Sequence, residues 1–325
     1  MTGSRIAIPA SFFGIVLGLV GLGDCWRAAS RAWGLPHTMD KLVMACAFGV
    51  WLLLLVLYVG KWVWAREEAL AELRHPVQSC FVGLVGVATL LAAVAIAPQA
   101  KSLALTLFVV GAVLQGGYGL WFVGRQWQGE REPSTATPAL YLPTVAGNFV
   151  TSFVAGYFGY VELGALFFGA GLLSWLALES LLLYRLSFLA MPPPLRPTLG
   201  ILLAPPVVGC VGYLFLTGGV AGAKPDLFAQ VLLGYGLLQL LLLLRVLPWI
   251  LKQPFGASYW AFSFGVTALA FDAIVFVLRG QTGYIEWLSM ALFGLANVLI
   301  AVLVVGTLWR LLTGKLLPPP LAGLK

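Results

Sequence analysis

The fold is decided by runs such as Leu237-Leu-Gln-Leu-Leu-Leu-Leu-Leu244, in which Gln239 is the one polar side chain. This run lies within a predominantly apolar stretch over residues 227–247. A single helix needs roughly 20 such residues to cross a hydrocarbon core about 30 Å thick. Strands of a membrane β-barrel would instead alternate apolar and polar side chains, and neither this run nor Leu52–Leu57 does so. The sequence therefore predicts membrane-spanning helices.

The composition of the whole chain agrees with such helices. Of its 325 residues, 61% are hydrophobic and 10% are charged, against roughly 45–50% and about 25% in an average soluble domain. This composition excludes an ordinary soluble enzyme. The net charge of +7, from 19 Lys and Arg against 12 Asp and Glu, would indicate a nucleic-acid partner in a soluble chain. Charges as sparse as these do not indicate a nucleic-acid partner, so we expect none.

Further runs of spanning length occur along the chain. The ten predicted spans cover residues 8–28, 42–64, 77–98, 102–124, 141–161, 163–184, 197–218, 227–247, 257–278 and 285–309. The first run continues to Leu22 and similar runs follow it, so it is interpreted as a span and not as a cleaved signal peptide. The connections are too short for a soluble domain. We therefore expect an all-α fold with a single ten-helix membrane domain over residues 1–325.

The basic residues predict the orientation in the membrane. An even number of spans places both termini on one side, and cytoplasmic loops are enriched in Lys and Arg. Thirteen of the 19 basic residues fall on the side of the termini. The other six are Arg27, Arg31, Lys41, Lys101, Lys224 and Arg279. Both termini are therefore expected in the cytoplasm, for a multi-pass protein of the inner (plasma) membrane.

Proline divides the spans into two sets. Pro9, Pro76, Pro143 and the pair Pro205 and Pro206 lie within or at the start of odd-numbered spans, and the interiors of the even spans contain none. Proline bends a helix interior but is tolerated in the first turn. Pro205 and Pro206 are therefore candidate kinks, with a first-turn position as the alternative. We expect five hairpins, with the odd helices in an inner ring around a pore and the even helices in an outer ring.

Small and polar residues on the odd spans are candidates for lining that pore. They are Gly14, Asn148, Ser263, Gly265 and Thr267. Small residues also let helices pack closely, and even spans contain glycines as well, at Gly116, Gly117 and Gly119. Close packing therefore remains the alternative for the glycines.

Two carboxylates stand out at membrane depth, Glu179 in the sixth predicted span and Asp272 in the ninth. An ionised carboxylate there is costly unless it is paired, protonated or hydrated, so both are candidates for a functional role. Arg279 follows Asp272 by two helical turns on nearly the same face, which makes a structural ion pair the alternative. For Glu179, in an outer span, a structural role is favoured.

No group of residues indicates catalysis, a metal or a cofactor. The histidines His37 and His75 lie in predicted loops, and the cysteines Cys25, Cys46, Cys80 and Cys210 show no metal-binding spacing. The charged segment with Glu67, Glu68 and Glu72 is expected to form a solvated extension of the second helix. We expect neither an enzyme nor a resident cofactor or metal.

The segment Tyr259-Trp-Ala-Phe-Ser-Phe-Gly-Val-Thr-Ala-Leu-Ala270 resembles the family of TehA tellurite-resistance proteins, plant slow anion channels and malic-acid transporters. Further matching stretches extend over essentially the full length. They are Phe12–Gly18, Tyr141–Phe149, Leu166–Gly171, Leu203–Pro206, Gly234–Gln239 and Arg245–Trp249.

The resemblance implies ten helices in five hairpins and a homotrimer with one pore per subunit. It also implies a pore occluded by a phenylalanine of the ninth helix, which by the motif is Phe264. Phe262 lies about 200° away around a helix, so only one of the two can face the pore. Gly14 matches a pore-facing glycine that would leave room beside the phenyl ring. Asp272 departs from the family pattern.

Two functions follow as hypotheses. The first is a gated channel for small monovalent anions such as chloride or nitrate, with dehydration cost setting selectivity. The second is a secondary carrier for C4-dicarboxylates such as malate, or for tellurite, with Asp272 or Glu179 as a proton-coupling site. Carriers usually show two related halves, so five similar hairpins favour the channel. The expected partners are anions, the lipid bilayer and further copies of the chain.

Overall fold

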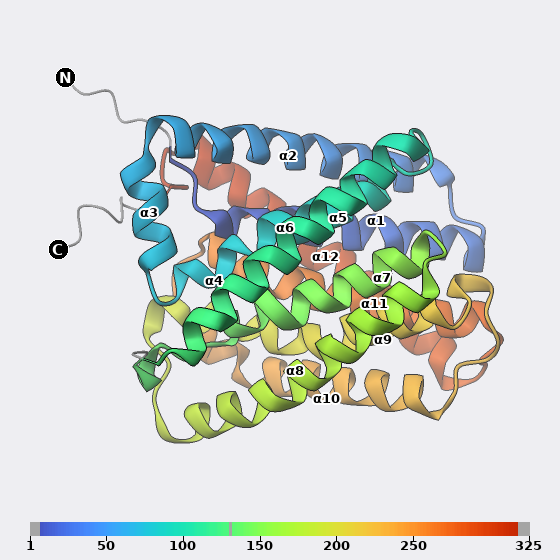
Figure 1. Cartoon of the computed structure of the whole chain (residues 1–325). Helices are drawn as coiled ribbons and strands as arrows, with labels where there is room; N and C mark the ends of the chain where they lie inside the picture. Colours follow the sequence, from blue (N-terminus) through green and yellow to red (C-terminus); the bar gives the residue numbers. More distant parts are fainter. Residues whose placement is uncertain (1–6, 130–131, 318–325) are drawn as a thin grey trace.

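The computed structural model describes residues 7–129 and 132–317, and over these the regular structure is entirely helical. Ten helical stretches are long and apolar enough to span a membrane. They are Ala10–Trp33, His37–Trp64, Gln78–Ile96, Lys101–Trp127, Pro138–Tyr157, Val161–Phe188, Pro193–Leu216, Leu227–Ile250, Ala257–Leu278 and Tyr284–Leu312. They run side by side along one direction (Figure 1). The all-α membrane fold and the number of spans are confirmed.

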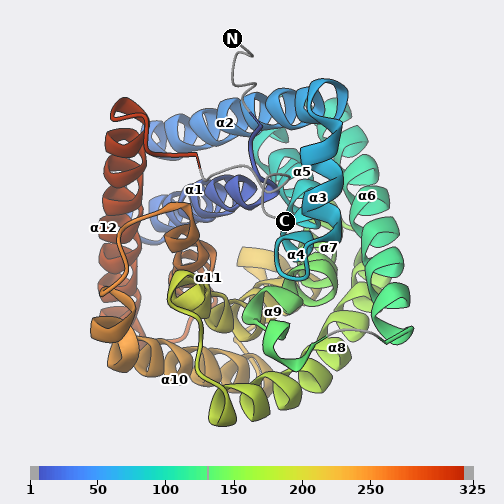
Figure 2. The same ribbon diagram turned by 90° about the vertical axis from the view of Figure 1, so that its left-hand side faces the viewer.

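Odd and even spans differ sharply in burial. In the membrane-spanning part of each odd span 72–83% of the residues are buried, against 17–33% in each even span. The even helices are α2 (His37–Trp64), α6 (Lys101–Trp127), α8 (Val161–Phe188), α10 (Leu227–Ile250) and α12 (Tyr284–Leu312). Figure 2 shows these five at the perimeter, where exposed apolar side chains such as Leu120 and Val305 cover them. Such side chains are suited to contact lipid.

The inner helices are α1 (Gly14–Trp33), α5 (Leu84–Ile96), α7 (Gly147–Tyr157), α9 (Ala204–Leu216) and α11 (Ser263–Leu278). Each is preceded by a short helical stretch within the same span, of 3₁₀ or π winding in four spans and a separate α-helical turn in the span of α5. These stretches are the 3₁₀ turns η1 (Ala10–Phe13), η5 (Pro193–Leu203) and η7 (Ala257–Phe262), the π-helical η4 (Leu142–Ala146), and α4 (Gln78–Val82). All five lie at the end where the chain enters the odd spans.

Pro205 and Pro206 lie in the first turn of α9, directly after the 3₁₀ segment η5. A proline there gives up no helical hydrogen bond, because the first N–H groups of a helix have no partner within it. The two prolines therefore mark the change of winding, and the first-turn alternative describes them better than a kink within a helix.

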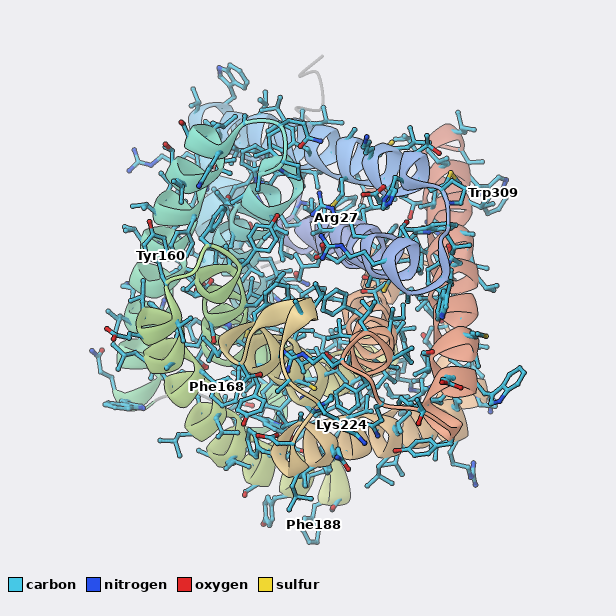
Figure 3. All side chains as sticks on the ribbon, turned by 90° about the vertical axis from the view of Figure 1, so that its right-hand side faces the viewer. Arg27, Tyr160, Phe168, Phe188, Lys224 and Trp309 are labelled. Carbon is cyan, nitrogen blue, oxygen red and sulfur yellow. The ribbon has the colours of Figure 1, made fainter. Side chains whose placement is uncertain are left out.

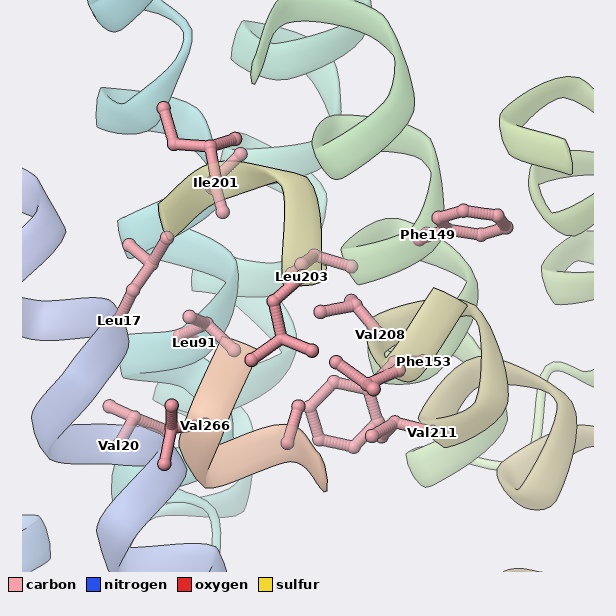
Figure 4. Close-up of a cluster of buried hydrophobic side chains, with 14 of the residues drawn as sticks. Leu17, Val20, Leu91, Phe149, Phe153, Ile201, Leu203, Val208, Val211 and Val266 are labelled. Atoms are coloured by element: carbon pink, nitrogen blue, oxygen red, sulfur yellow. The ribbon is translucent and has the colours of Figure 1, made fainter. Parts of the chain in front are cut away.

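The inner helices pack closely around an apolar core. Figure 4 shows side chains from all five inner spans meeting there, among them Leu17, Leu91, Phe153, Leu203 and Val266. Glycines allow α1 to approach α11. A Cβ atom on Gly18 would lie 2.5 Å from Cβ of Ser263, and one on Gly21 would lie 2.9 Å from Cβ of Thr267.

The charged segment after the second span forms a separate helix, α3 (Arg66–Arg74), which lies across one end of the bundle (Figure 1). The chain bends at Ala65, with φ −136° and ψ 49°. Glu72 is fully buried and accepts hydrogen bonds from Lys61 Nζ at 2.8 Å and from the backbone N of Ala10 at 2.8 Å. The prediction of a solvated extension is therefore wrong for Glu72, because the bend folds α3 against the start of the first span.

Candidate functional site

A central cavity of about 200 Å³ lies at the transitions from these leading stretches to the inner helices. Its wall includes one residue close to each of the five transitions: Gly14, Leu84, Ala146, Ala204 and Phe264. Polar groups come from Ser11, Gln78, Thr198 and Ser258. Among the described residues, no Asp, Glu, Lys or Arg side chain lines this cavity. It can hold a small solute through dipoles but offers no countercharge.

Phe264 lines this cavity and also a second, smaller one. The second cavity, of about 20 Å³, is lined by Phe264 and Ala268 of α11, Gly21 and Asp24 of α1, and Val208 of α9, among others. Phe264 and Val208 line both cavities. The side chain of Phe264 therefore borders two neighbouring spaces among the inner helices.

Phe262 faces a different direction from Phe264. It packs against η5, where a Cβ atom on Gly200 would lie 2.8 Å from its ring. It also lines a groove between α10 and α12, together with Leu243 and Leu299. This placement agrees with the separation of about 200° around the helix.

Gly14 lines the central cavity, but it is not the glycine beside the phenyl ring. A Cβ atom on Gly14 would have Cβ of Trp260, at 3.8 Å, as its one neighbour within 4 Å in the described part of the chain. A Cβ atom on Gly21 would lie 3.5 Å from the ring of Phe264. Gly14 therefore lines the same cavity as Phe264 without contacting its ring, and Gly21, two turns further along α1, is the nearer glycine.

The other candidates for lining the pore line neither cavity. Ser263 and Thr267 lie in the contact between α11 and α1, and their hydroxyl groups donate to the backbone oxygens of Trp260 at 2.7 Å and Ser263 at 3.0 Å. Gly265 packs against Leu203, whose Cγ would lie 2.9 Å from an added Cβ. Asn148 is half-buried on α7. The small size of Ser263, Gly265 and Thr267 therefore allows α11 to pack closely against neighbouring helical segments.

Glu179 on α8 is surrounded by hydrogen-bond donors. Its carboxylate accepts from Trp175 Nε1 at 2.8 Å, from Tyr235 Oη at 2.7 Å and from Tyr141 Oη. Tyr141 also lines the central cavity. Through these hydrogen bonds Glu179 links Tyr141 in the cavity wall to the outer helices α8 and α10. This arrangement agrees with the structural role that the sequence favours for Glu179.

Asp272 on α11 is fully buried, and among the described residues no N–H or O–H group donates to its carboxylate; its polar neighbour is the thiol of Cys210 on α9. The ion pair considered for it with Arg279 does not form. Arg279 follows the last residue of α11 and instead donates to the backbone oxygens of Gly219 at 2.7 Å and of Leu214. The guanidinium group thus binds the open carbonyls at the end of α9, because helix ends leave such groups unsatisfied. Asp272 lines neither cavity.

His75 positions the helix that brings Gln78 to the cavity. Its Nδ1 accepts hydrogen bonds from the backbone N of Val77 and of Gln78, both at 3.1 Å. Partial burial lowers the pKa of His75 below its usual 6.5, because burial disfavours the charged imidazolium. The neutral ring can therefore cap the start of α4 at physiological pH.

The sequence interpretation missed Asp24, although it lies within the first predicted span. Asp24 lines the second cavity, and Arg27 Nη1 lies 3.4 Å from its Oδ1. An acidic and a basic residue three positions apart near the end of an apolar span are the signal that identifies such a pair.

Comparison with known proteins supports an anion-transport family. Residues 7–308 match the family model described as "SLAC1: Voltage-dependent anion channel". The chain is 33% identical over 309 residues to a "Tellurite resistance protein TehA homolog" of Haemophilus influenzae, a match that covers 95% of this chain and 92% of that protein.

Two plant proteins of Arabidopsis thaliana are also similar. The "Guard cell S-type anion channel SLAC1" is 24% identical, with 93% of this chain and 56% of that protein covered. The "S-type anion channel SLAH3" is 23% identical, with 92% of this chain and 48% of that protein covered. Both plant proteins are described as anion channels. Because the family model spans nearly the whole chain and its ten helices, the chain belongs to the SLAC1 family of voltage-dependent anion channels.

Proposed function

We propose that the protein is a gated channel that conducts small monovalent anions, chloride and nitrate, through the centre of each subunit. Phe264 occludes the path and opens it by a change of side-chain rotamer. The carrying observation is that Phe264 lines both the 200 Å³ cavity and the 20 Å³ cavity. In this proposal three copies of the chain assemble in the inner membrane with their termini in the cytoplasm.

The side chains that line the central cavity favour rapid conduction of anions and not tight binding of them. Its polar groups are hydroxyls and an amide, and no charged side chain of the described residues lines it. Rapid conduction requires that an ion can leave a site as easily as it enters. An uncharged wall leaves dehydration cost as the main barrier, which favours monovalent over divalent anions.

Phe264→Ala tests the gate. We expect chloride and nitrate conductance in planar bilayers to rise at least tenfold, since lowering a barrier by about 1.4 kcal/mol changes a rate tenfold. Phe262→Ala is the matched control, because Phe262 packs against η5 and the outer groove. Unchanged conductance in a well-expressed Phe264→Ala protein contradicts the gate.

The second candidate function is a proton-coupled carrier for malate or tellurite. The observation in its favour is Asp272, a buried carboxyl group to which no N–H or O–H group of the described residues donates, which resembles the proton-relay residues of membrane transporters. Uptake into vesicles that is driven by a pH gradient and lost in Asp272→Asn would support it. Conductance that persists without a pH gradient supports the channel.

A further inference from the structure

The two cavities beside Phe264 differ in charge. No charged residue of the described chain lines the central cavity, whereas Asp24 is among the residues that line the smaller one. Asp24 is the one acidic or basic side chain of the described residues that lines either cavity. An anion that passes Phe264 therefore meets a negative charge next.

Arg27 lies directly beyond this carboxylate and is held by three helices. Its Nη1 lies 3.4 Å from Asp24 Oδ1, and its Nε lies 3.8 Å from Asp40 Oδ2 on α2. It also donates to the backbone oxygens of Val94 at 3.2 Å and Ala95 at 3.4 Å, near the end of α5. Figure 3 shows Arg27 inside the ring of outer helices, on the face away from α3. Such a guanidinium group has a fixed position relative to the path.

The opposite charges of Asp24 and Arg27 lie close together beside the smaller cavity. Asp24 and Arg27 are both largely buried, with 14% and 18% of their side chains exposed, so water screens them weakly. Alone, Asp24 would repel an anion in the adjacent cavity. Arg27 offsets part of that repulsion, because its single positive charge is shared between the carboxylates of Asp24 and Asp40.

We propose that the Asp24–Arg27 pair is the electrostatic selectivity element on the far side of Phe264 and sets how strongly anions are preferred over cations. This inference rests on the proposed channel function. It narrows the substrate class to monovalent inorganic anions, because Asp24 repels a dicarboxylate about twice as strongly as a chloride ion.

The test uses the Phe264→Ala protein as background, with the path open, in bilayers under a potassium chloride gradient. Adding Arg27→Gln leaves Asp24 uncompensated, so chloride conductance falls roughly tenfold and the reversal potential moves toward that of potassium. Adding Asp24→Asn raises chloride conductance and moves the reversal potential toward that of chloride. The double change returns both quantities close to those of the background protein.

Lys101→Gln is the matched control, since it removes a positive charge from an exposed position at the start of α6. It leaves the reversal potential unchanged. Arg27→Lys, which keeps the charge, retains chloride preference and separates the electrostatic effect from misfolding. A Phe264→Ala protein that does not conduct overturns the proposed function itself. A conducting Phe264→Ala protein whose reversal potential is the same with Asp24→Asn and with Arg27→Gln overturns this inference alone.

Discussion

Glu72 and Asp272 are both fully buried carboxylates, but they lie in opposite chemical surroundings. Glu72 accepts hydrogen bonds from Lys61 Nζ at 2.8 Å, Tyr58 Oη at 3.2 Å and the backbone N of Ala10 at 2.8 Å. Neither oxygen of Asp272 has such a partner. Burial alone therefore does not determine whether the fold stabilises a carboxylate. The hydrogen-bond donors around the carboxylate determine it.

The difference follows from where the two residues lie. Glu72 lies where α2, α3 and the entry to the first span meet, so a cation and a free backbone N–H group are within reach. Asp272 lies in the middle of α11, where the backbone groups of neighbouring helices are already used. Glu179 is intermediate, with three neutral donors and no cation. These three carboxylates define a series that mutations can test.

The largest effect is expected for Glu72→Gln. This change leaves the buried Lys61 ammonium without a countercharge, and breaking a buried ion pair in this way costs about 3–5 kcal/mol of unfolding free energy. Denaturation in detergent micelles, followed by tryptophan fluorescence, measures the loss. Glu67→Gln on the exposed face of the same helix is the control. A loss below about 1 kcal/mol would show that Glu72 behaves as a surface carboxylate.

The sequence predicted the spans well but could not predict these partners. Hydropathy identifies ten apolar stretches because each must cover the bilayer core with apolar side chains. The partners of Glu72 depend on the bend at Ala65, a backbone conformation that no hydropathy window reports. For Asp272, helical spacing placed Arg279 two turns away. However, α11 ends at Leu278, before Arg279, and the arginine binds backbone oxygens at and just after the end of α9 instead.

The candidate site shows the same limit. The phenylalanine beside the cavities could be chosen by motif, and helical geometry correctly separated it from Phe262. The choice of Ser263, Gly265 and Thr267 rested on small size and polarity, which helix packing also requires. Asp24 lies near the end of the first predicted span, where a charged residue is common and does not by itself indicate a site. Only tertiary structure places it beside Phe264.

A smaller effect is expected for Tyr235→Phe. It removes one of three donors to Glu179 and leaves the carboxylate with the other two, so the free energy of unfolding falls by about 2 kcal/mol. The same detergent titration measures it. Tyr184→Phe, at an exposed position on α8, provides the matched control. A loss as large as that of Glu72→Gln would mean that neutral donors can replace a cation in stabilising a buried carboxylate.

The smallest effect is expected for Asp272→Asn. This change keeps the shape of the side chain and removes no hydrogen bond or ion pair, so the free energy of unfolding changes by less than about 1 kcal/mol. It is the same carboxylate-to-amide change as Glu72→Gln at equal burial, so the two results directly compare a carboxylate that has hydrogen-bond donors with one that lacks them.

Anion conductance of the Phe264→Ala protein should also persist when Asp272→Asn is added, because Asp272 lines neither cavity. A large loss of stability would reveal a partner that forms in the membrane. Unchanged stability together with lost uptake in a pH gradient would instead make Asp272 a proton-transfer residue and favour the carrier over the channel.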